Sequence, residues 1–345
     1  MKIGKCDLNK SVYVIAEVGG NHGGDFNLAK KYVREAAKAG VNAVKFQMYR
    51  GRRLVTRVME PLPMVSGKYK SQLERFEELE FSNDEFVELA GYAKKKGVDY
   101  CASVWDEEMA ELLYEIGDFF KIGSGDLTNL PLLRYIIKKG KPILLSTGFA
   151  RIEEIERVLS EIPKERLVLL HCVGSYPCPL EDANLSTIPF LRERFGVMVG
   201  YSDHTIGTLA SKVAVLLGAR VIEKHFTLDK NNPIGDHRLS ADPKEMKEIV
   251  DDIKKIERMM GTVKTGPLSS ELKIKRMMRR SLAAKVDIPK GSILTHDILT
   301  SLRPEDGISP LFVDEVVGKK VLRDIKEGEI IYYEDIHGFP QRRSK

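Results

Sequence analysis

The sequence predicts a parallel (β/α)8 barrel of the TIM type, followed by a smaller β-rich domain. Short apolar, β-branched runs alternate eight times with amphipathic helical patterns over about 260 residues, which is the usual size of such a barrel. Four histidines stand at or just after the ends of predicted strands: His22, His171, His204 and His225. The carboxyl ends of barrel strands form the active-site face, so these positions indicate a polar, metal-assisted enzyme site. A doubly wound sheet is the second choice, because it rarely needs eight parallel strands.

Most of the predicted strands are apolar on both faces, as expected for parallel strands buried between helices and a barrel interior. The eight strands are Val12–Val18, Ala43–Met48, Asp99–Trp105, Phe119–Gly123, Pro142–Thr147, Leu167–Val173, Val197–Ser202 and Val221–Thr227. Helical patterns between and after them include Leu28–Ala39, Asp84–Lys96, Thr208–Leu217 and Pro243–Met260. The segment 50–83 is long for a βα loop, and long barrel loops commonly form lids or substrate walls.

The domain boundaries follow from a change of pattern after the last barrel helix. We expect the barrel over residues 1–262, a linker with a short basic helix over 263–280, and the second domain over 281–345. The stretches DIPKGSILTHDI and DIKEGEIIYYEDI form an internal repeat, each predicted as a strand, a turn and a second strand. A domain of about 60 residues is marginal for independent stability, so we expect it to dock on another surface.

Composition describes a globular protein with a full core, since 43% of its 345 residues are hydrophobic and 30% are charged. No apolar stretch approaches the ~20 residues that span a bilayer, and the first residues lack a secretory pattern, so we expect a cytoplasmic protein without a membrane partner. Net charge is only +5, and the basic clusters RGRR, KIKRMMRR and QRRSK lack interleaved aromatic residues, so no nucleic-acid partner is expected. The four cysteines form no CxxC pair, and no disulfide is expected.

Polar side chains near the predicted strand ends form a ring. Its members are Glu17, Lys45, Gln47, Ser103, Lys121, Ser124, Asp126, Ser146, His171, Ser202, His204, Glu223 and His225. Two lysines and several hydroxyls facing one cavity suit a substrate that carries a phosphate and a carboxylate. A Schiff-base role for Lys45 or Lys121 is the alternative that the residues leave open.

Two of the histidines, His204 and His225, come from adjacent predicted strands and could ligate one divalent ion. Imidazoles without a thiolate suit Mn²⁺, Zn²⁺ or Fe²⁺, and such an ion would polarise a carbonyl oxygen. Asp203 and Asp236 are the nearest carboxylates in sequence that could orient this site.

The motifs IAEVGGNHGG, VKFQ, KIGSGD, ILLSTG, HCVGSYPCP, GYSDHT, IEKHFT and DHRLS resemble those of the sialic acid (N-acetylneuraminate) synthase family. The segment SLAAKVDIPKGSILTHDILTSLRPEDGI resembles the antifreeze-like, β-clip-type domain at the C-terminus of those synthases. The resemblance runs over nearly the whole chain in the family's order. It implies condensation of phosphoenolpyruvate with N-acetylmannosamine or a related acylamino sugar, and with water, to a nine-carbon 2-keto acid and phosphate. The alternatives are a Schiff-base aldolase and another phosphoenolpyruvate-dependent aldose synthase.

The resemblance also implies roles for individual residues. It assigns a divalent metal, with Mn²⁺ first and Mg²⁺ or Co²⁺ as alternatives, to His204 and His225. The implied phosphoenolpyruvate contacts are Lys45, Ser103, Lys121, Ser124, Ser146 and Ser202. The implied sugar contacts are Gln47, Tyr176, Asp236 and Arg303, and the implied proton-transfer carboxylates are Glu17, Asp126 and Glu223. It further implies a domain-swapped homodimer in which Arg303 serves the neighbouring subunit.

Three positions depart from the family pattern. Gly174 stands where relatives place a polar side chain, Asp126 stands where Glu is frequent, and Trp105 replaces a usual Phe. The last two bear on the identity of the sugar more than on the type of reaction.

Overall fold

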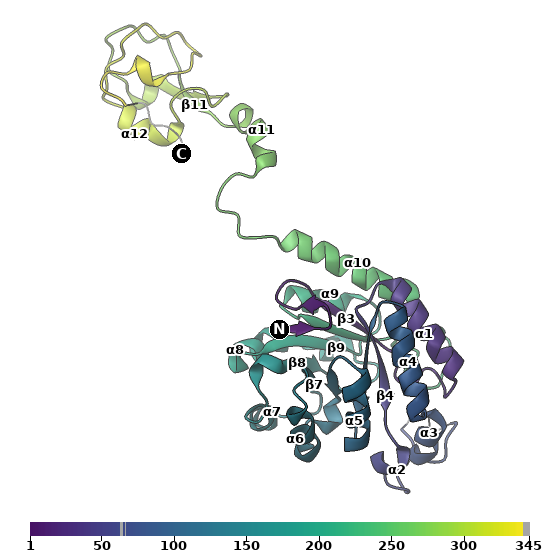
Figure 1. Ribbon diagram of the computed structural model, residues 1–345. Helices are drawn as coiled ribbons and strands as arrows, with labels where there is room; N and C mark the ends of the chain where they lie inside the picture. Colours follow the sequence, from purple (N-terminus) through teal and green to yellow (C-terminus); the bar gives the residue numbers. More distant parts are fainter. Residues whose placement is uncertain (63–64, 66, 341–345) are drawn as a thin grey trace. The chain divides into compact units, whose positions relative to one another are not determined.

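The computed structural model describes residues 1–62, 65 and 67–340, and it contains the predicted barrel (Figure 1). Eight parallel strands close in the order β10-β3-β4-β5-β6-β7-β8-β9. The strands are β3 (Tyr13–Glu17), β4 (Ala43–Met48), β5 (Asp99–Val104), β6 (Phe120–Ile122), β7 (Ile143–Ser146), β8 (Leu167–Cys172), β9 (Met198–Asp203) and β10 (Val221–His225). Each lies within a predicted strand or overlaps one closely, so the prediction of a TIM barrel is confirmed.

Side chains alternate along each strand between two buried layers, one between the strands and the helices and one inside the barrel. On β3, Val14 and Ala16 pack toward the helices, whereas Tyr13 and Ile15 join an apolar cluster inside the barrel. Two residues further along the inward face stands Glu17, at the carboxyl end of the strand. The amino-terminal half of the barrel is therefore filled by apolar side chains, while polar side chains occupy its carboxyl end.

Helices surround the barrel, and several begin at a side-chain cap. Asp25, Ser82, Asp106 and Asp242 each accept a hydrogen bond from a backbone N–H in the first turn of their helix. The helices are α1 (Phe26–Ala39), α2 (Gly51–Leu54), α3 (Gln72–Leu79), α4 (Asn83–Lys95), α5 (Glu107–Ile116), α6 (Leu130–Lys138), α7 (Ile152–Leu159), α8 (Thr187–Phe195), α9 (Leu209–Leu216) and α10 (Pro243–Met260). The long loop after β4 thus contains α2 and α3.

A short N-terminal hairpin, β1 (Lys2–Ile3) and β2 (Cys6–Asp7), was not predicted from the sequence. Ile3 and Leu8 are fully buried and belong to the same apolar cluster as the barrel interior. The hairpin therefore closes the amino end of the barrel, which leaves the carboxyl end as the open one.

The chain divides into two compact units, residues 1–261 and 262–345. The second unit contains α11 (Ser269–Met278), the antiparallel pair β11 (Ser281–Ala284) and β12 (Leu299–Leu302), and α12 (Val313–Val316). Its core is a separate apolar cluster that includes Leu282, Ile308 and Ile331.

The internal repeat of the second unit differs from its prediction as two strand–turn–strand segments. Neither copy forms a regular strand over its length; the copies meet through isolated bridges such as Ile288 with Ile325, and each ends in a 3-10 turn. The turns hold Gly291 and Gly328 at positive φ, which interrupts the ladder and leaves single bridges.

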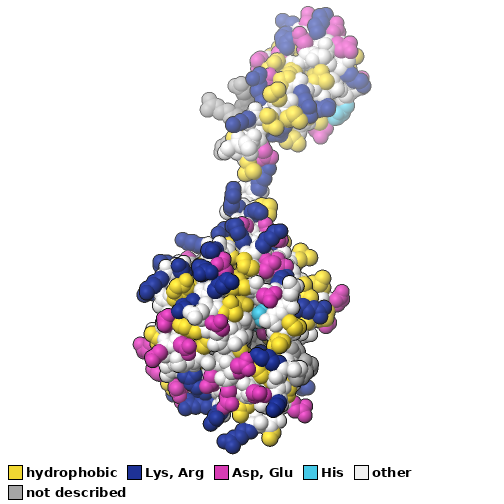
Figure 2. Space-filling view, turned by 90° about the vertical axis from the view of Figure 1, so that its right-hand side faces the viewer, with side chains coloured by type: hydrophobic (Ala, Val, Ile, Leu, Met, Phe, Trp, Pro, Cys, Tyr) yellow, Lys and Arg dark blue, Asp and Glu magenta, His cyan; other side chains and the backbone are white. Residues whose placement is uncertain are grey.

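Figure 2 shows Lys and Arg side chains interspersed with Asp and Glu side chains on the visible face of each unit. Within the part of the chain that the structure describes, no helix is both long and apolar enough to cross a membrane.

Candidate active site

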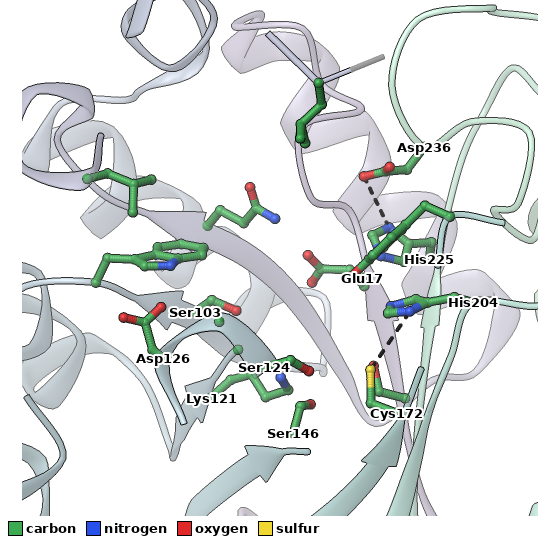
Figure 3. Close-up of a pocket in the computed structure, with 18 of the residues that line it drawn as sticks. Glu17, Ser103, Lys121, Ser124, Asp126, Ser146, Cys172, His204, His225 and Asp236 are labelled. Atoms are coloured by element: carbon green, nitrogen blue, oxygen red, sulfur yellow. Dashed lines mark hydrogen bonds and ion pairs between the residues drawn. The ribbon is translucent and has the colours of Figure 1, made fainter. Parts of the chain in front are cut away.

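A cavity of about 360 Å³ opens at the carboxyl ends of the barrel strands. Every residue to which the family resemblance assigned a role, except Arg303, lines it. These residues are Glu17, Lys45, Gln47, Ser103, Lys121, Ser124, Asp126, Ser146, Tyr176, Ser202, His204, Glu223, His225 and Asp236. In Figure 3, Glu17, His204, His225 and Asp236 lie on one side of the cavity, facing Ser103, Lys121, Ser124 and Ser146 on the other.

Two lysines and two glutamates form a buried cluster at the floor of this cavity. Lys45 Nζ lies 2.7 Å from Glu17 Oε2 and 3.9 Å from Glu223 Oε2. Lys121 Nζ lies 3.8 Å from Glu223 Oε1 and donates a hydrogen bond of 3.1 Å to the Ile122 carbonyl. Strand register explains the cluster, because Glu17 pairs with Lys45 across β3 and β4.

Burial and neighbouring charges shift the pKa values of the two glutamates in opposite directions. Burial raises the pKa of Glu17 to about 7, against the opposing charge of Lys45. Burial acts in the same direction on Glu223, but Lys121 and Lys45 outweigh it, so the pKa of Glu223 is lowered. Glu17 can therefore exchange a proton near neutral pH while Glu223 stays ionised, which is the division of roles that acid–base catalysis requires.

The lysines differ as well. Burial lowers the pKa of Lys121, whereas for Lys45 the carboxylates of Glu17 and Glu223 outweigh burial and raise the pKa. Lys45 is thus a fixed positive charge in the cavity. For Lys121 burial outweighs the charge of Glu223, which acts in the opposite direction.

The serines of the cavity supply hydroxyls, not all of which are engaged. Ser103 Oγ accepts a hydrogen bond of 2.9 Å from Lys45, and Ser202 Oγ donates one of 3.0 Å to Glu223. Ser124 Oγ accepts from the backbone N–H of Gly148 at 3.0 Å. Ser146 Oγ is buried without a hydrogen-bond partner among the described residues, and so is Glu223 Oε2. Such unpaired buried groups are costly, and a polar ligand would satisfy them.

The two cavity histidines, His204 and His225, lie beside each other and are the candidate ligands for a divalent metal ion. Their ring centroids are 5.4 Å apart. His204 Nδ1 lies 2.7 Å from the Val173 carbonyl oxygen; in the neutral ring that donates its Nδ1–H to this carbonyl, Nε2 carries no proton and can act as a ligand. His225 Nδ1 is buried without a hydrogen-bond partner within the described chain and lies 3.7 Å from Asp236 Oδ2. Burial lowers the pKa of His225 well below its ordinary value, so its ring is neutral and able to ligate.

Asp236 therefore lies where the sequence analysis expected an orienting carboxylate, but Asp203 does not. Asp203 is fully buried, accepts hydrogen bonds from Thr205 and Ser211, and pairs with Lys224 at 3.3 Å. Side chains alternate along a strand, so Asp203 points away from the cavity because Ser202 points into it.

Two of the four strand-end histidines are structural, which corrects the expectation that all four belong to one site. His171 Nε2 bonds the Ala183 carbonyl at 2.7 Å, and its ring stacks on Tyr201. His22 Nδ1 accepts a hydrogen bond from the Gly24 backbone, and burial lowers its pKa to about 4. Neither lines the cavity.

Arg303 lies in the second unit and is exposed. Its neighbours in sequence do not neutralise it, since Glu305 pairs with Lys275 and Arg279 and Asp306 pairs with Arg276. Among the described residues, therefore, these carboxylates do not engage the Arg303 guanidinium.

The structure adds cavity residues that the sequence analysis missed. Gln72 and Arg75 reach the cavity from α3, and Phe149 reaches it from the loop after β7. The backbone of Phe149 has a positive φ of 66°. The Phe149 ring fills the space beside Gly174, since a Cβ added at Gly174 would lie 1.9 Å from Phe149 Cζ. An aromatic ring therefore occupies the place of the polar side chain expected at position 174. No sequence motif marks any of these residues.

Comparison with known proteins identifies the family to which the chain belongs. Residues 32–265 match the NeuB family and residues 279–337 match the SAF domain. The chain is 41% identical over 331 residues to the N,N'-diacetyllegionaminic acid synthase of Campylobacter jejuni, covering 93% of this chain and 99% of that protein. It is 36% identical over 337 residues to the N-acetylneuraminate-9-phosphate synthase of Homo sapiens, covering 94% of this chain and 93% of that protein.

A solved structure shares the fold. The N-acetylneuraminic acid (sialic acid) synthetase of Leptospira borgpetersenii, crystallised in complex with citrate, matches with a TM-score of 0.70 at 38% identity and covers 79% of this chain and 92% of that one. The predicted resemblance to sialic acid synthases with an antifreeze-like domain is thereby confirmed. The chain belongs to the NeuB family and carries a C-terminal SAF domain.

Proposed function

We propose that this protein is a nonulosonic acid synthase that condenses phosphoenolpyruvate with an acylamino hexose and water, releasing phosphate. The observation that carries the proposal is the cavity itself, where Lys45, Lys121, Glu17 and Glu223 lie beside His204 and His225. The names of its relatives, a legionaminic acid synthase and a neuraminate-9-phosphate synthase, support the same class of reaction.

Lys45 and Lys121 would hold the phosphate and carboxylate of phosphoenolpyruvate. Their charges are balanced by Glu17 and Glu223 in the free protein, so a bound anion competes with those carboxylates for the lysines. The unpartnered hydroxyl of Ser146 supplies a further donor to the same anion.

His204 and His225 would hold the divalent metal, with Mn²⁺ first and Mg²⁺ or Co²⁺ as alternatives. Bound there, the ion would act as a Lewis acid toward the aldehyde oxygen of the open-chain sugar. Gln47, Tyr176 and Asp236 line the same cavity and would orient the sugar.

In the reaction, C3 of phosphoenolpyruvate bonds to the aldehyde carbon and C2 becomes electron-deficient. Water adds to C2, and cleavage of the bond between C2 and the phosphate oxygen leaves the 2-keto acid and phosphate. Of the two protons of water, one ends on the former aldehyde oxygen, which becomes a hydroxyl, and the other leaves with phosphate. Glu17, with its pKa near 7, would accept the proton from water. Holding both reactants in one cavity makes the carbon–carbon bond formation effectively unimolecular.

We further propose a homodimer in which Arg303 reaches the neighbouring barrel. Arg303 supports this arrangement, since Glu305 and Asp306 pair with other residues in the described part of the chain. The exposed apolar side chains of α11 support it as well: Leu272, Ile274 and Met277 are 55%, 55% and 68% exposed. Apolar exposure of this extent is typical of a surface that another chain covers.

The test is release of phosphate from phosphoenolpyruvate in the presence of a panel of acylamino hexoses. We expect release that depends on both the sugar and a divalent metal, and that stops with EDTA and returns with Mn²⁺. His204→Ala and His225→Ala should remain folded, lose bound metal and lose turnover. Full activity in a sample verified as metal-free would contradict the metal site.

A Schiff-base aldolase is the second candidate, because burial lowers the pKa of Lys121 and favours a neutral amine. Borohydride in the presence of pyruvate would then add a stable mass to Lys121. Loss of that labelling in Lys121→Ala, with turnover that survives EDTA, would favour the aldolase over the synthase.

A further inference from the structure

A buried ion pair, Asp203 with Lys224, connects the two strand ends that carry the cavity histidines. Asp203 ends β9 and immediately precedes His204, Lys224 immediately precedes His225 on β10, and the two residues are register partners. We propose that this pair positions the two imidazoles for a divalent metal, acting through the backbone of both strand ends. The inference rests on the proposed function and adds two positioning residues to it.

The side chains of the pair lie between the strands and the helices. Strand alternation directs Asp203 and Lys224 away from the cavity that the two histidines line. Both side chains are 0% exposed, their charged atoms are 3.3 Å apart, and no other ion pair in the described part of the chain is as fully buried. The neighbouring positions on the same face, Val199, Tyr201 and Ile222, belong to the apolar core.

Stability gives no strong reason for a charged pair in this layer. Removing two charges from water is costly, and apolar side chains of similar volume at such places commonly give equal or greater stability. A buried ion pair does restrict the segments that it joins to one arrangement, because each charge needs its partners. The hydrogen bonds of the pair show which segments these are.

The pair holds the backbone on both sides of His204. Asp203 Oδ1 accepts hydrogen bonds from the Thr205 backbone N–H at 2.8 Å and from its hydroxyl at 2.7 Å, and Lys224 Nζ donates to the Thr205 carbonyl. Ser211 on α9 donates to Asp203 Oδ2 at 2.6 Å. Both sequence neighbours of His204 are therefore bound to Lys224, which comes from the adjacent strand.

The same contacts bear on His225, whose ring has fewer contacts of its own. His225 Nδ1 has no hydrogen-bond partner among the described residues, whereas His204 Nδ1 lies 2.7 Å from the Val173 carbonyl oxygen. The position of the His225 ring therefore depends on its backbone, which directly follows Lys224. Within the described chain no group of three or more His, Cys, Asp or Glu side chains could hold a metal, so binding depends on how closely these two imidazoles are held.

The experiment measures the affinity of the full chain for Mn²⁺, without substrates, by isothermal titration calorimetry. The test variant combines Asp203→Asn with Lys224→Met, so that no buried charge is left without a partner. The matched control combines Lys212→Met with Glu248→Gln, because this ion pair of 2.6 Å joins α9 to α10 and neither residue lines the cavity. We expect the test variant to bind Mn²⁺ at least about tenfold more weakly than wild type, and the control to bind as wild type does.

Thermal melting without metal shows whether the test variant is folded. If it is not, Thr205→Val replaces it, since this substitution removes the hydroxyl that donates to Asp203 and keeps the shape of the side chain. Thr205→Val should weaken Mn²⁺ binding by about threefold or more, and wild-type affinity in this variant would then overturn the inference.

For a folded test variant, weakening by more than about threefold that the control does not share supports the inference. A smaller effect, or an equal effect in the control, overturns it and leaves the proposed function intact. Absence of divalent-metal binding in the wild type would instead count against the metal site of the proposed function, and it would overturn this inference as well.

Discussion

Replacing Glu17 with Gln removes the charge of this side chain while keeping its shape. The carboxyl is fully buried, lies 2.7 Å from Lys45, and has a pKa of about 7. If Glu17 accepts the proton of water in the reaction, kcat/KM of the wild type should fall as pH drops below about 7, because the base becomes protonated. Glu17→Gln should lose roughly 10²- to 10⁴-fold in kcat and should lack this acidic limb.

The same substitution has a stability effect whose sign follows from linkage. The pKa of Glu17 in the folded protein lies above its ordinary value of 4.5, so protonation of Glu17 stabilises the folded state. This contribution to the free energy of unfolding is complete below pH 4.5 and is lost as pH rises through about 7. Between those two limits it changes by roughly 3 kcal/mol. Relative to wild type, Glu17→Gln should therefore gain stability between pH 4.5 and 7, on the order of 5–10 °C in Tm.

Phosphate release and thermal melting, both followed from pH 4.5 to 8.5 (about four pH units), test the two effects together. Glu88→Gln is the control, since Glu88 is an exposed carboxylate paired with Lys30. The buried histidines are present in both proteins, so their contributions cancel in the difference. An acidic limb that persists in Glu17→Gln, together with a Tm difference that does not change with pH, would refute this reasoning.

Other predictions concern the lysines and Arg303. Lys224→Met should cost about 3–5 kcal/mol in urea unfolding, because it leaves buried Asp203 without its ion-pair partner at 3.3 Å; an unchanged midpoint would show that the pair contributes nothing. Lys45→Ala should raise the KM for phosphoenolpyruvate at least about tenfold with metal content unchanged, as measured by steady-state kinetics and metal analysis. A mixed dimer of His204→Ala with Arg303→Ala, each inactive alone, should recover activity in one barrel, and no recovery in a confirmed mixed dimer would exclude action between subunits.

Particular elements show how far the sequence analysis reached. The helix Pro243–Met260 was predicted to the residue, because a capping aspartate and a proline mark its start and a glycine follows its end. The N-terminal hairpin was missed, since two-residue strands leave no periodic pattern. The internal repeat was recognised, but the prediction that it forms regular strands was wrong. Isolated bridges and regular strands have the same apolar pattern in the sequence, so the pattern could not distinguish them.

The sequence by itself determined the barrel and the residues of its polar rim. Short apolar runs encode the strands, and the change from apolar to polar side chains along each inward face places Glu17, Lys45 and Glu223 at the carboxyl ends. Both features depend only on the order of apolar and polar residues within short segments, and this order can be read from a single sequence.

Only the tertiary structure decided which polar residues face one another. Strand alternation sends Asp203 outward and His225 inward, and the loop after β4 folds back so that Gln72 and Arg75 reach a cavity formed by distant strands. Burial, which raises the pKa of Glu17 to about 7, likewise depends on side chains from across the barrel. Contacts between residues far apart in sequence leave no periodic pattern in a single chain. The sequence could therefore predict where the site lies, but not which side chains pair there or how their pKa values shift.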